Sequence, residues 1–150
     1  MPSAHAGRSA GAVRGGARGA FDTPRLTCDP VKVLALRGAT TCAENTKAEV
    51  DSKTQRLVEE MLGRNEIGHD DLVSIIFTAT DDITAEFPAT AARALGLGDV
   101  PLLCARELGI EHGMPMAIRV LMHFYGDQPR NELHHVYLEG ARTLRDDLPD

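Results

Sequence analysis

The sequence predicts an α+β fold in which a mixed β-sheet carries its helices on one face. Strands and helices should alternate in the first part of the region 31–150, whereas the last three expected strands follow one another without a helix. Helical crossovers favour parallel strands and direct connections favour antiparallel ones, so we expect both in one sheet. Only two helices of note are expected. They can cover one face, and we expect the other, apolar face to pack against further subunits in a homo-oligomer.

The first half of this region alternates apolar runs with an amphipathic segment. VKVLALR, at 31–37, is mostly apolar and predicts a buried strand. Thr46 and Glu49 have the spacing of a capping box, and the apolar residues behind them recur at helical intervals. We therefore predict an amphipathic helix over about 46–64. LVSIIFTAT, at 72–80, predicts a second buried strand.

The second half begins with a proline that suits the first position of a helix. Pro88 predicts a short helix, which should stop at the glycines of the segment 96–98. PLLCARE, at 101–107, predicts a third strand. The segment 116–125 alternates apolar residues with others, as a strand does. A fifth strand over 134–138 and a short helical or turn-like tail complete the expected order.

The first thirty residues differ in composition from the rest. The segment 1–20 is rich in Ala, Gly and Arg and lacks an apolar centre, so it is not a secretory signal. Its composition loosely matches an organelle transit peptide, but such sequence cannot bury enough surface to fold. We interpret 1–30 as a disordered or mis-assigned N-terminal extension, and 31–150 as one domain.

Composition and charge exclude several classes of function. The net charge is −6, and without a dense basic stripe we expect no nucleic-acid partner. No apolar run is long enough to span a bilayer, so no membrane partner is expected. The three cysteines are an odd number, are widely spaced and form no CxxC pair, which argues against a zinc site or a disulfide framework. Reduced thiols in a cytoplasm are therefore expected for Cys28, Cys42 and Cys104.

Four arginines drawn from separate elements suggest a site for a small anion. Guanidinium groups are always charged and recognise carboxylates with two parallel hydrogen bonds. Glu107 is the obvious acidic counterpart. The chain also lacks a Gly-rich dinucleotide motif, a P-loop and a nucleophile elbow, so we expect no cofactor. The four residues are Arg37, Arg93, Arg119 and Arg145.

Several of the candidate residues also have a plainer interpretation. Arg37 can be a surface residue that closes a strand, although Gly38 behind it can turn the chain with positive φ or admit a ligand. Arg119 interrupts a strand and points either to solvent or into a cleft. Cys104 is a small packing residue more readily than a nucleophile. The pair 134–135 is no metal site, because neighbouring strand residues point to opposite faces.

Several longer strings resemble one enzyme family. ALRGATTCAENT, TATDDITAEFPATAAR, VPLLCARELGIEHGMPMAIRVLMH and HHVYLEGARTLRDDL occur here in the order found in the monofunctional chorismate mutases of the AroH class. The resemblance runs from about Val33 to Leu148. It implies a homotrimer in which three mixed sheets form a pseudo-α/β-barrel, with active sites between neighbouring subunits. It also implies the Claisen rearrangement of chorismate to prephenate, on the way to phenylalanine and tyrosine, without a metal or cofactor.

The resemblance also implies roles for individual residues. Arg119 would contact the ether oxygen and a carboxylate of the side chain, Glu107 would accept a hydrogen bond from the ring hydroxyl, and Arg37 and Tyr137 would hold the side-chain carboxylate. Other residues would line the site: Leu103, Cys104, Ala105 and Arg106, with Phe87, Ala89 and Arg93 from the neighbouring subunit and Leu144 and Arg145 from a mobile C-terminal segment. Two positions depart from the family, since His134 stands where arginine is frequent and Thr90 stands where lysine is frequent.

Two other functions fit the same pattern. A trimeric small-molecule-binding or regulatory protein can share this fold without mutase activity, because a fold does not determine a function. A related enzyme, such as a deaminase of reactive enamines, is a third interpretation. The presence of Arg37, Glu107, Arg119 and Tyr137 in their expected contexts favours the mutase.

Overall fold

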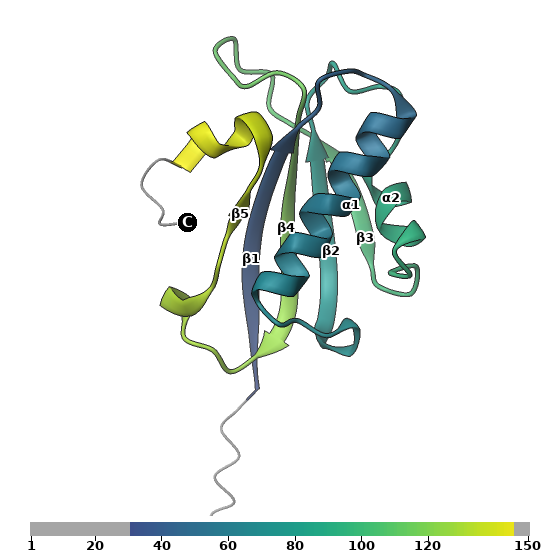
Figure 1. Ribbon diagram of the computed structural model, residues 1–150. Coiled ribbons are helices and arrows are strands. Elements are labelled where there is room, and N and C mark those ends of the chain that lie inside the picture. Colours follow the sequence, from purple (N-terminus) through teal and green to yellow (C-terminus); the bar gives the residue numbers. More distant parts are fainter. Residues whose placement is uncertain (1–30, 146–150) are drawn as a thin grey trace, which may run out of the picture.

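The computed structural model describes residues 31–145, and the strands among them form one five-stranded sheet in the order β3-β2-β4-β1-β5 (Figure 1). These strands are β1 (Lys32–Thr41), β2 (Leu72–Ala79), β3 (Leu102–Arg106), β4 (Ala117–Gly126) and β5 (Val136–Tyr137). The helices are α1 (Lys47–Arg64) and α2 (Pro88–Ala94), with short 3-10 segments η1 (His69–Asp71), η2 (Arg130–Glu132) and η3 (Glu139–Arg145). The predicted extension 1–30 and Cys28 lie outside the described residues.

The sheet is mixed, as the sequence predicted. β4 occupies the centre and pairs in antiparallel fashion with β1 on one side and β2 on the other. The outer pairs, β2 with β3 and β1 with β5, are parallel. The crossover from β2 to β3 runs through α2, which is the connection that a parallel pair requires. Among the helices of the described region, none is long and apolar enough to cross a membrane.

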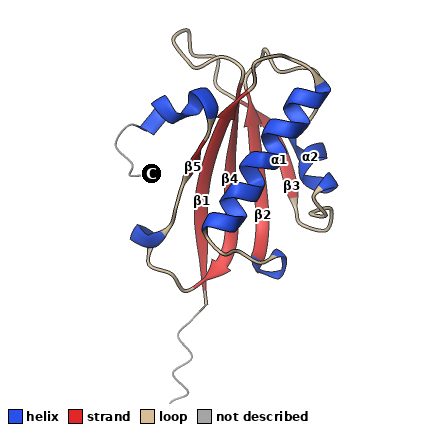
Figure 2. Ribbon diagram, viewed as in Figure 1, coloured by secondary structure: helices blue, strands red, loops and turns tan. Residues whose placement is uncertain are grey.

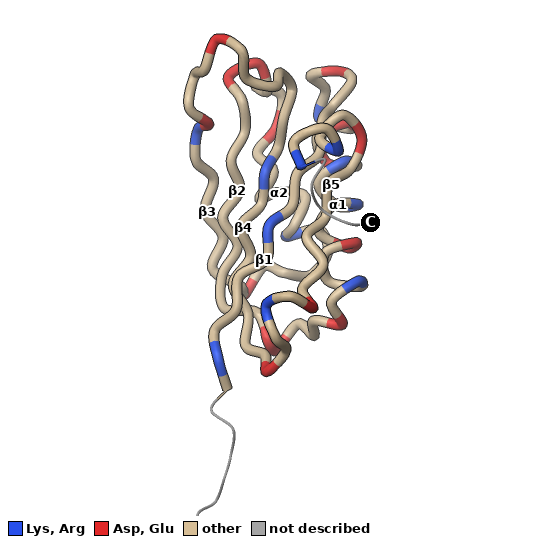
Figure 3. Tube along the Cα trace, turned by 90° about the vertical axis from the view of Figure 1, so that its left-hand side faces the viewer, with Lys and Arg blue, Asp and Glu red and all other residues tan. Residues whose placement is uncertain are grey.

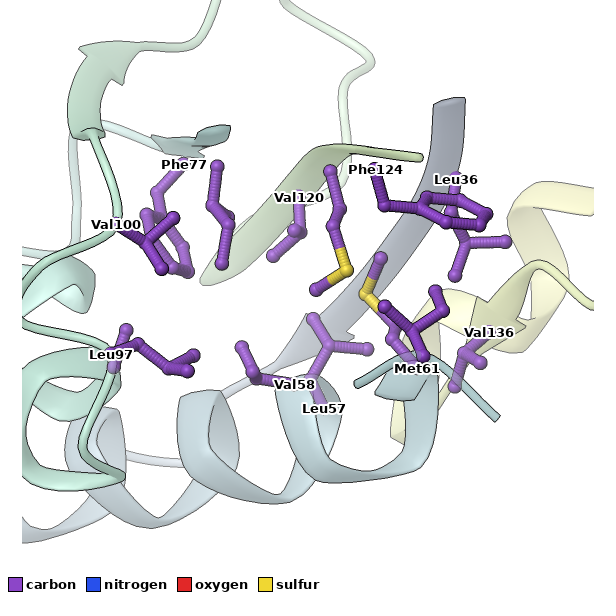
Figure 4. Close-up of a cluster of buried hydrophobic side chains, with 14 of the residues drawn as sticks. Leu36, Leu57, Val58, Met61, Phe77, Leu97, Val100, Val120, Phe124 and Val136 are labelled. Atoms are coloured by element: carbon purple, nitrogen blue, oxygen red, sulfur yellow. The ribbon is translucent and has the colours of Figure 1, made fainter. Parts of the chain in front are cut away.

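Both helices lie on one face of the sheet, which confirms the predicted layering (Figure 2). In the view along the sheet edge, α1 stands to one side of β1, β4 and β2 (Figure 3). Alternate residues of these strands meet one face of α1, and together they form the main core (Figure 4). This core is apolar and close-packed, because both layers bury only one face. Its fully buried members include Leu36, Leu57, Val58, Met61, Phe77, Met122 and Phe124.

The other face of the sheet is covered by neither α1 nor α2. Val33, Leu103 and Tyr125 lie on it with 56%, 58% and 49% of their surface exposed. Their strand neighbours of opposite parity, such as Leu34 and Phe124, are buried under α1 instead. Large apolar side chains on one open sheet face are typical of a surface that meets another protein.

Gly38 does not turn the chain at the end of the first strand, which was one of the two roles that the sequence had suggested; the other, close approach of a ligand, stays a prediction. β1 continues to Thr41, and Gly38 is a buried mid-strand residue opposite Val120. A Cβ atom placed on it would overlap the Met61 Sδ atom and lie 3.1 Å from Leu57 Cδ1. The glycine is therefore needed because α1 packs against the backbone of β1 at this point.

Two local predictions are also corrected by contacts with other residues. Thr46 caps α1 by accepting from the Glu49 N–H at 3.3 Å, but the Glu49 carboxylate bonds Ala43 N–H at 3.0 Å and not Thr46. The fifth strand spans only Val136–Tyr137, because the backbone N–H and C=O of His134 bind the side chain of Asn65 instead of a strand. By contrast, Pro88 begins α2 as predicted.

Candidate active site

Arg119 lies at the middle of the uncovered face. It is on the central strand β4, between Ala39 of β1 and Thr78 of β2. Strand alternation turns it away from its buried neighbours Ile118 and Val120. Its side chain is 45% exposed. The sequence left open whether this arginine points to solvent or into a cleft. Its side chain lines a cavity, so it points into a cleft.

A cavity of about 350 Å³ brings together five of the predicted site residues. Three arginines line it, and its other lining residues are uncharged. Positive charge focused in a concave, partly apolar surface favours a small anion. Three of them come from strands and two from η3, and they are Arg37, Arg119 and Tyr137, and Leu144 and Arg145.

Glu107 lies beside Arg119, as the predicted acidic counterpart should. Its Oε1 atom is 3.5 Å from Arg119 Nε, and its side chain is only 18% exposed. The Thr78 hydroxyl donates a short hydrogen bond to the same oxygen, and the Glu107 N–H bonds the carbonyl of Ala79 at 3.0 Å. Thr78 was not predicted as a site residue. It orients the carboxylate beside the arginine, and the alternation of β2 could have placed it on the open face.

His135 contacts the site through Arg37. The Arg37 backbone N–H donates to His135 Nδ1 at 3.1 Å, so the neutral ring must carry its proton on Nε2. Burial lowers the pKa of His135, and the charges of Arg37 and Arg145 lower it further. The sequence had considered this histidine only as a metal ligand. Within residues 31–145, no three side chains of His, Cys, Asp or Glu converge as metal ligands do.

Acidification should therefore destabilise the fold through His135. The pKa of this ring is lowered in the folded state, whereas in the unfolded chain it is about 6.5. The unfolded state takes up a proton first, so the free energy of unfolding should decrease as the pH falls through about 6.5. His135→Asn keeps an acceptor for Arg37 and cannot titrate there. Urea unfolding between pH 8 and pH 5 should show a smaller pH dependence in that variant, and an unchanged one would contradict the assignment.

A second group of predicted residues lines a different cavity, of about 500 Å³. Phe87 is exposed at its rim, and Arg106 forms a bidentate ion pair with Asp81 there. That hydrogen-bonded guanidinium lowers the pKa of the Asp81 carboxyl. Cys104 lines the cavity and also packs against the core, which agrees with the packing interpretation. Ala105 completes the predicted members of this group.

The remaining predicted residues lie near this second cavity without lining it. Leu103 is exposed on the uncovered face, on edge strand β3. Ala89 is buried in the first turn of α2, and Arg93 is exposed in its last turn. Thr90 donates from its hydroxyl to the Glu86 carboxylate at 3.2 Å. α2 thus presents Arg93 at the surface, and the residue that caps its N-terminus, Phe87, presents an aromatic side chain there.

The two cavities share no lining residue. Cys104 pairs with Phe77 and so faces the helices, whereas Arg119 pairs with Thr78 and faces the open side. The residues that the sequence assigned to one site are therefore divided within a single chain. One part surrounds Arg119, and the other surrounds the edge strand β3 and the start of α2.

Comparisons with known proteins identify the family of this chain. The family described as "Chorismate mutase type I" matches residues 33–148. Chorismate mutase AroH of Thermus thermophilus is 43% identical over 117 residues, which cover 77% of this chain and 96% of that protein. Chorismate mutase AroH of Bacillus subtilis (strain 168) is 38% identical over 117 residues, which cover 77% and 92%.

A solved structure shares the fold at the same level of identity. The chorismate mutase from Clostridium thermocellum superimposes with a TM-score of 0.72 and 43% sequence identity, covering 73% of this chain and 98% of that one. The family match spans most of the described region, and both curated relatives are matched over nearly their whole length. The chain therefore belongs to the chorismate mutase type I family.

Proposed function

We propose that this protein catalyses the Claisen rearrangement of chorismate to prephenate. The observation that carries the proposal is the pair of Arg119 and Glu107, 3.5 Å apart, beside a cavity lined by three arginines. Chorismate is a dicarboxylate, so those guanidinium groups match its charge. The rearrangement involves one molecule and no nucleophile. It requires a compact conformer and stabilisation of the charge that develops as the C–O bond breaks.

Arg119 is assigned to the ether oxygen. Negative charge builds on this atom in the transition state, and a guanidinium that is already in place needs no reorganisation to stabilise it. Glu107 holds the arginine from one side and is itself fixed by the hydroxyl of Thr78. The same carboxylate is assigned to the ring hydroxyl of the substrate, from which it would accept a hydrogen bond.

The other residues of the cavity are assigned to substrate orientation. Arg37 and Tyr137 come from the paired strands β1 and β5, where Ala39 lies opposite Tyr137. They would hold the carboxylate of the enolpyruvyl side chain and so press that side chain over the ring. Leu144 and Arg145 of η3 lie at the same cavity and would close it. Such positioning supplies a large part of the rate enhancement in a one-substrate reaction.

Loss of the ultraviolet absorbance of chorismate tests the proposed activity directly. Micromolar protein should consume chorismate much faster than the uncatalysed reaction, and the product should be prephenate by chromatography. A catalyst that mainly positions its substrate should need no added metal, so EDTA should leave the rate unchanged. Absence of turnover would instead favour a binding or regulatory protein of the same fold.

We propose further that the active sites lie between subunits of a homotrimer. Two observations support this: the apolar side chains on the uncovered sheet face, and the division of the expected site between two separate cavities. A neighbouring chain that packs on the open face would bring its Phe87, Ala89 and Arg93 to the Arg119 cavity of the first. Homo-oligomers of this kind are closed and symmetric, so each chain would give and receive one half-site.

Mixing two inactive variants tests the shared site. Arg119→Ala damages the half that a chain keeps, whereas Arg93→Ala damages the half that it donates. When the two chains are unfolded, mixed equally and refolded, about one quarter of the sites in random trimers should contain two intact halves. Activity should therefore return to about one quarter of the wild-type value. A mixture as inactive as its parents would contradict a site built from two chains.

We also infer a cytoplasmic protein from its thiols. Cys42 and Cys104 are both free, as is common in a reducing compartment. Burial is the main cause that raises the pKa of Cys42 to about 11, so this thiol is not ionised at neutral pH. We therefore assign it no part in the chemistry.

A further inference from the structure

Two asparagines flank helix α1, and each binds the backbone of a segment that leads into one half of the proposed site. Asn45 lies two residues before the first residue of the helix, and Asn65 follows its last residue. Their side chains reach segments that lie far away in the sequence, at 84–85 and at 134. Neither asparagine lines either cavity, and the proposed mechanism gives neither of them a role.

Asn45 holds the chain just before Phe87. Its Oδ1 atom accepts hydrogen bonds from the N–H groups of Thr84 and Ala85, both at 2.9 Å. Its Nδ2 atom donates to the Thr84 hydroxyl at 2.8 Å. Three hydrogen bonds from one side chain thus fix two consecutive residues of an exposed loop, in which the backbone otherwise has few partners.

The same end of α1 makes a second attachment to this loop. Lys47 Nζ lies 2.5 Å from Glu86 Oε2, and Glu86 Oε1 accepts the Phe87 N–H at 2.8 Å. The lysine lowers the pKa of Glu86, so that carboxylate is charged at neutral pH. Each of the residues 84–87 is therefore attached, directly or through Glu86, to the beginning of α1. The next residue, Pro88, is the first of α2.

Asn65 makes the equivalent attachment at the other end. Its Oδ1 atom accepts from the His134 N–H at 2.8 Å, and its Nδ2 atom donates to the His134 carbonyl at 2.9 Å. It is anchored on the helix itself, because Nδ2 also donates to the Met61 carbonyl at 2.9 Å. The next residues along the chain are His135, which binds Arg37, and then β5 with Tyr137.

We propose that Asn45 and Asn65 are positioning residues, one for each half of the active site. Asn45 sets the place of Phe87 and α2, which a chain would donate to its neighbour, and Asn65 sets the place of Tyr137, which it keeps. α1 is the rigid element that fixes the distance between them. The catalytic meaning of this inference rests on the proposed function, whereas the attachment itself can be measured without it.

Hydrogen exchange on three purified variants tests the attachment. In Asn45→Ala, the amides of Thr84 and Ala85 should exchange at least about tenfold faster, while the segment 134–138 stays at the wild-type rate. In Asn65→Ala, the amides of the segment 134–138 should exchange faster, while those of Thr84 and Ala85 stay at the wild-type rate. Glu60→Gln, which removes an exposed ion pair on α1, should change neither segment. Equal acceleration of both segments in either asparagine variant, or none in its own segment, would overturn the proposal.

Steady-state kinetics and subunit mixing then test the effect on the site. Asn45→Ala should raise KM by about tenfold with kcat changed by less than about threefold, and Asn45→Asp, which keeps the acceptor oxygen, should restore most of the loss. Mixed with Arg119→Ala, the Asn45→Ala chain should recover low-KM sites, but not when mixed with Arg93→Ala. Altered exchange with unchanged kinetics would contradict positioning. A wild-type protein without turnover would refute the proposed function alone, since the exchange result stands by itself.

Discussion

Replacing Arg119 by alanine should lower kcat by about 10²–10³-fold, equivalent to roughly 3–4 kcal/mol of transition-state stabilisation. The figure is that for removing one preorganised donor from a developing oxyanion in acyl-transfer enzymes. It applies because the guanidinium is held by Glu107 at 3.5 Å and stands at a cavity whose walls are partly apolar. The measurement is initial-rate turnover of chorismate at saturating substrate.

Two further variants separate charge from geometry. Arg119→Lys keeps the charge without the planar fork, so it should recover only a small part of the lost rate. Arg64→Ala removes another arginine with a carboxylate partner, at the end of α1, and should leave kcat unchanged. If a folded Arg119→Ala protein kept near-normal kcat, the assignment of this residue to the ether oxygen would be wrong.

Gly38→Val should destabilise the folded protein by about 3 kcal/mol, near the upper end of what overpacking in a core costs. Even the first added carbon would overlap Met61 Sδ and press against Leu57 Cδ1, and both side chains are fully buried. Met61 and Leu57 would have to leave their places between α1 and β1, and β1 also carries Arg37 into the cavity. Urea unfolding followed by circular dichroism measures the change.

Gly63 is the control, since it is a glycine of α1 itself with free space around it. Nothing lies within 4 Å of a Cβ atom added there, and the residue is helical. Gly63→Ala should therefore stabilise the protein by about 0.5–1 kcal/mol through backbone entropy. If both substitutions changed the free energy of unfolding equally, lack of space beside Gly38 would not explain the glycine.

The elements with strong periodicity could be predicted from the sequence. The helix over about 46–64 and the strands over 72–80 and 116–125 were found within a few residues, because burial of one face imposes a regular spacing. The uncovered sheet face followed from the small number of helices. These features depend on the order of apolar and polar residues along the chain, which the sequence shows directly.

The errors arose where a distant residue decides the local structure. Gly38 was interpreted through its own flexibility, whereas Met61 of a packed helix explains it. The strand at 134–138 is shorter than predicted because Asn65 takes the hydrogen-bonding groups of His134. Sequence spacing contains no information on either contact.

For the candidate site too, the residue types could be predicted from the sequence but their contacts could not. Arg37, Arg119 and Glu107 could be selected from residue type and from family resemblance, but their meeting depends on strand register. Thr78 was missed for that reason, because only the register of β2 with β4 places it opposite Arg119.

The central place of β4 has a consequence for synthesis on the ribosome. β1 is made first, yet it does not pair with β2 or β3, so its ladder waits for β4. Until β4 is made, β2 can pair only with β3. Pairing across such long separations makes folding slow, and unpaired strand edges stay exposed to other chains meanwhile. A nascent chain that stops before Ala117 has neither the central strand of the sheet nor Arg119. The strand that carries Arg119, for which we propose the catalytic role, is thus also the one that ends the exposure of β1 as an unpaired strand.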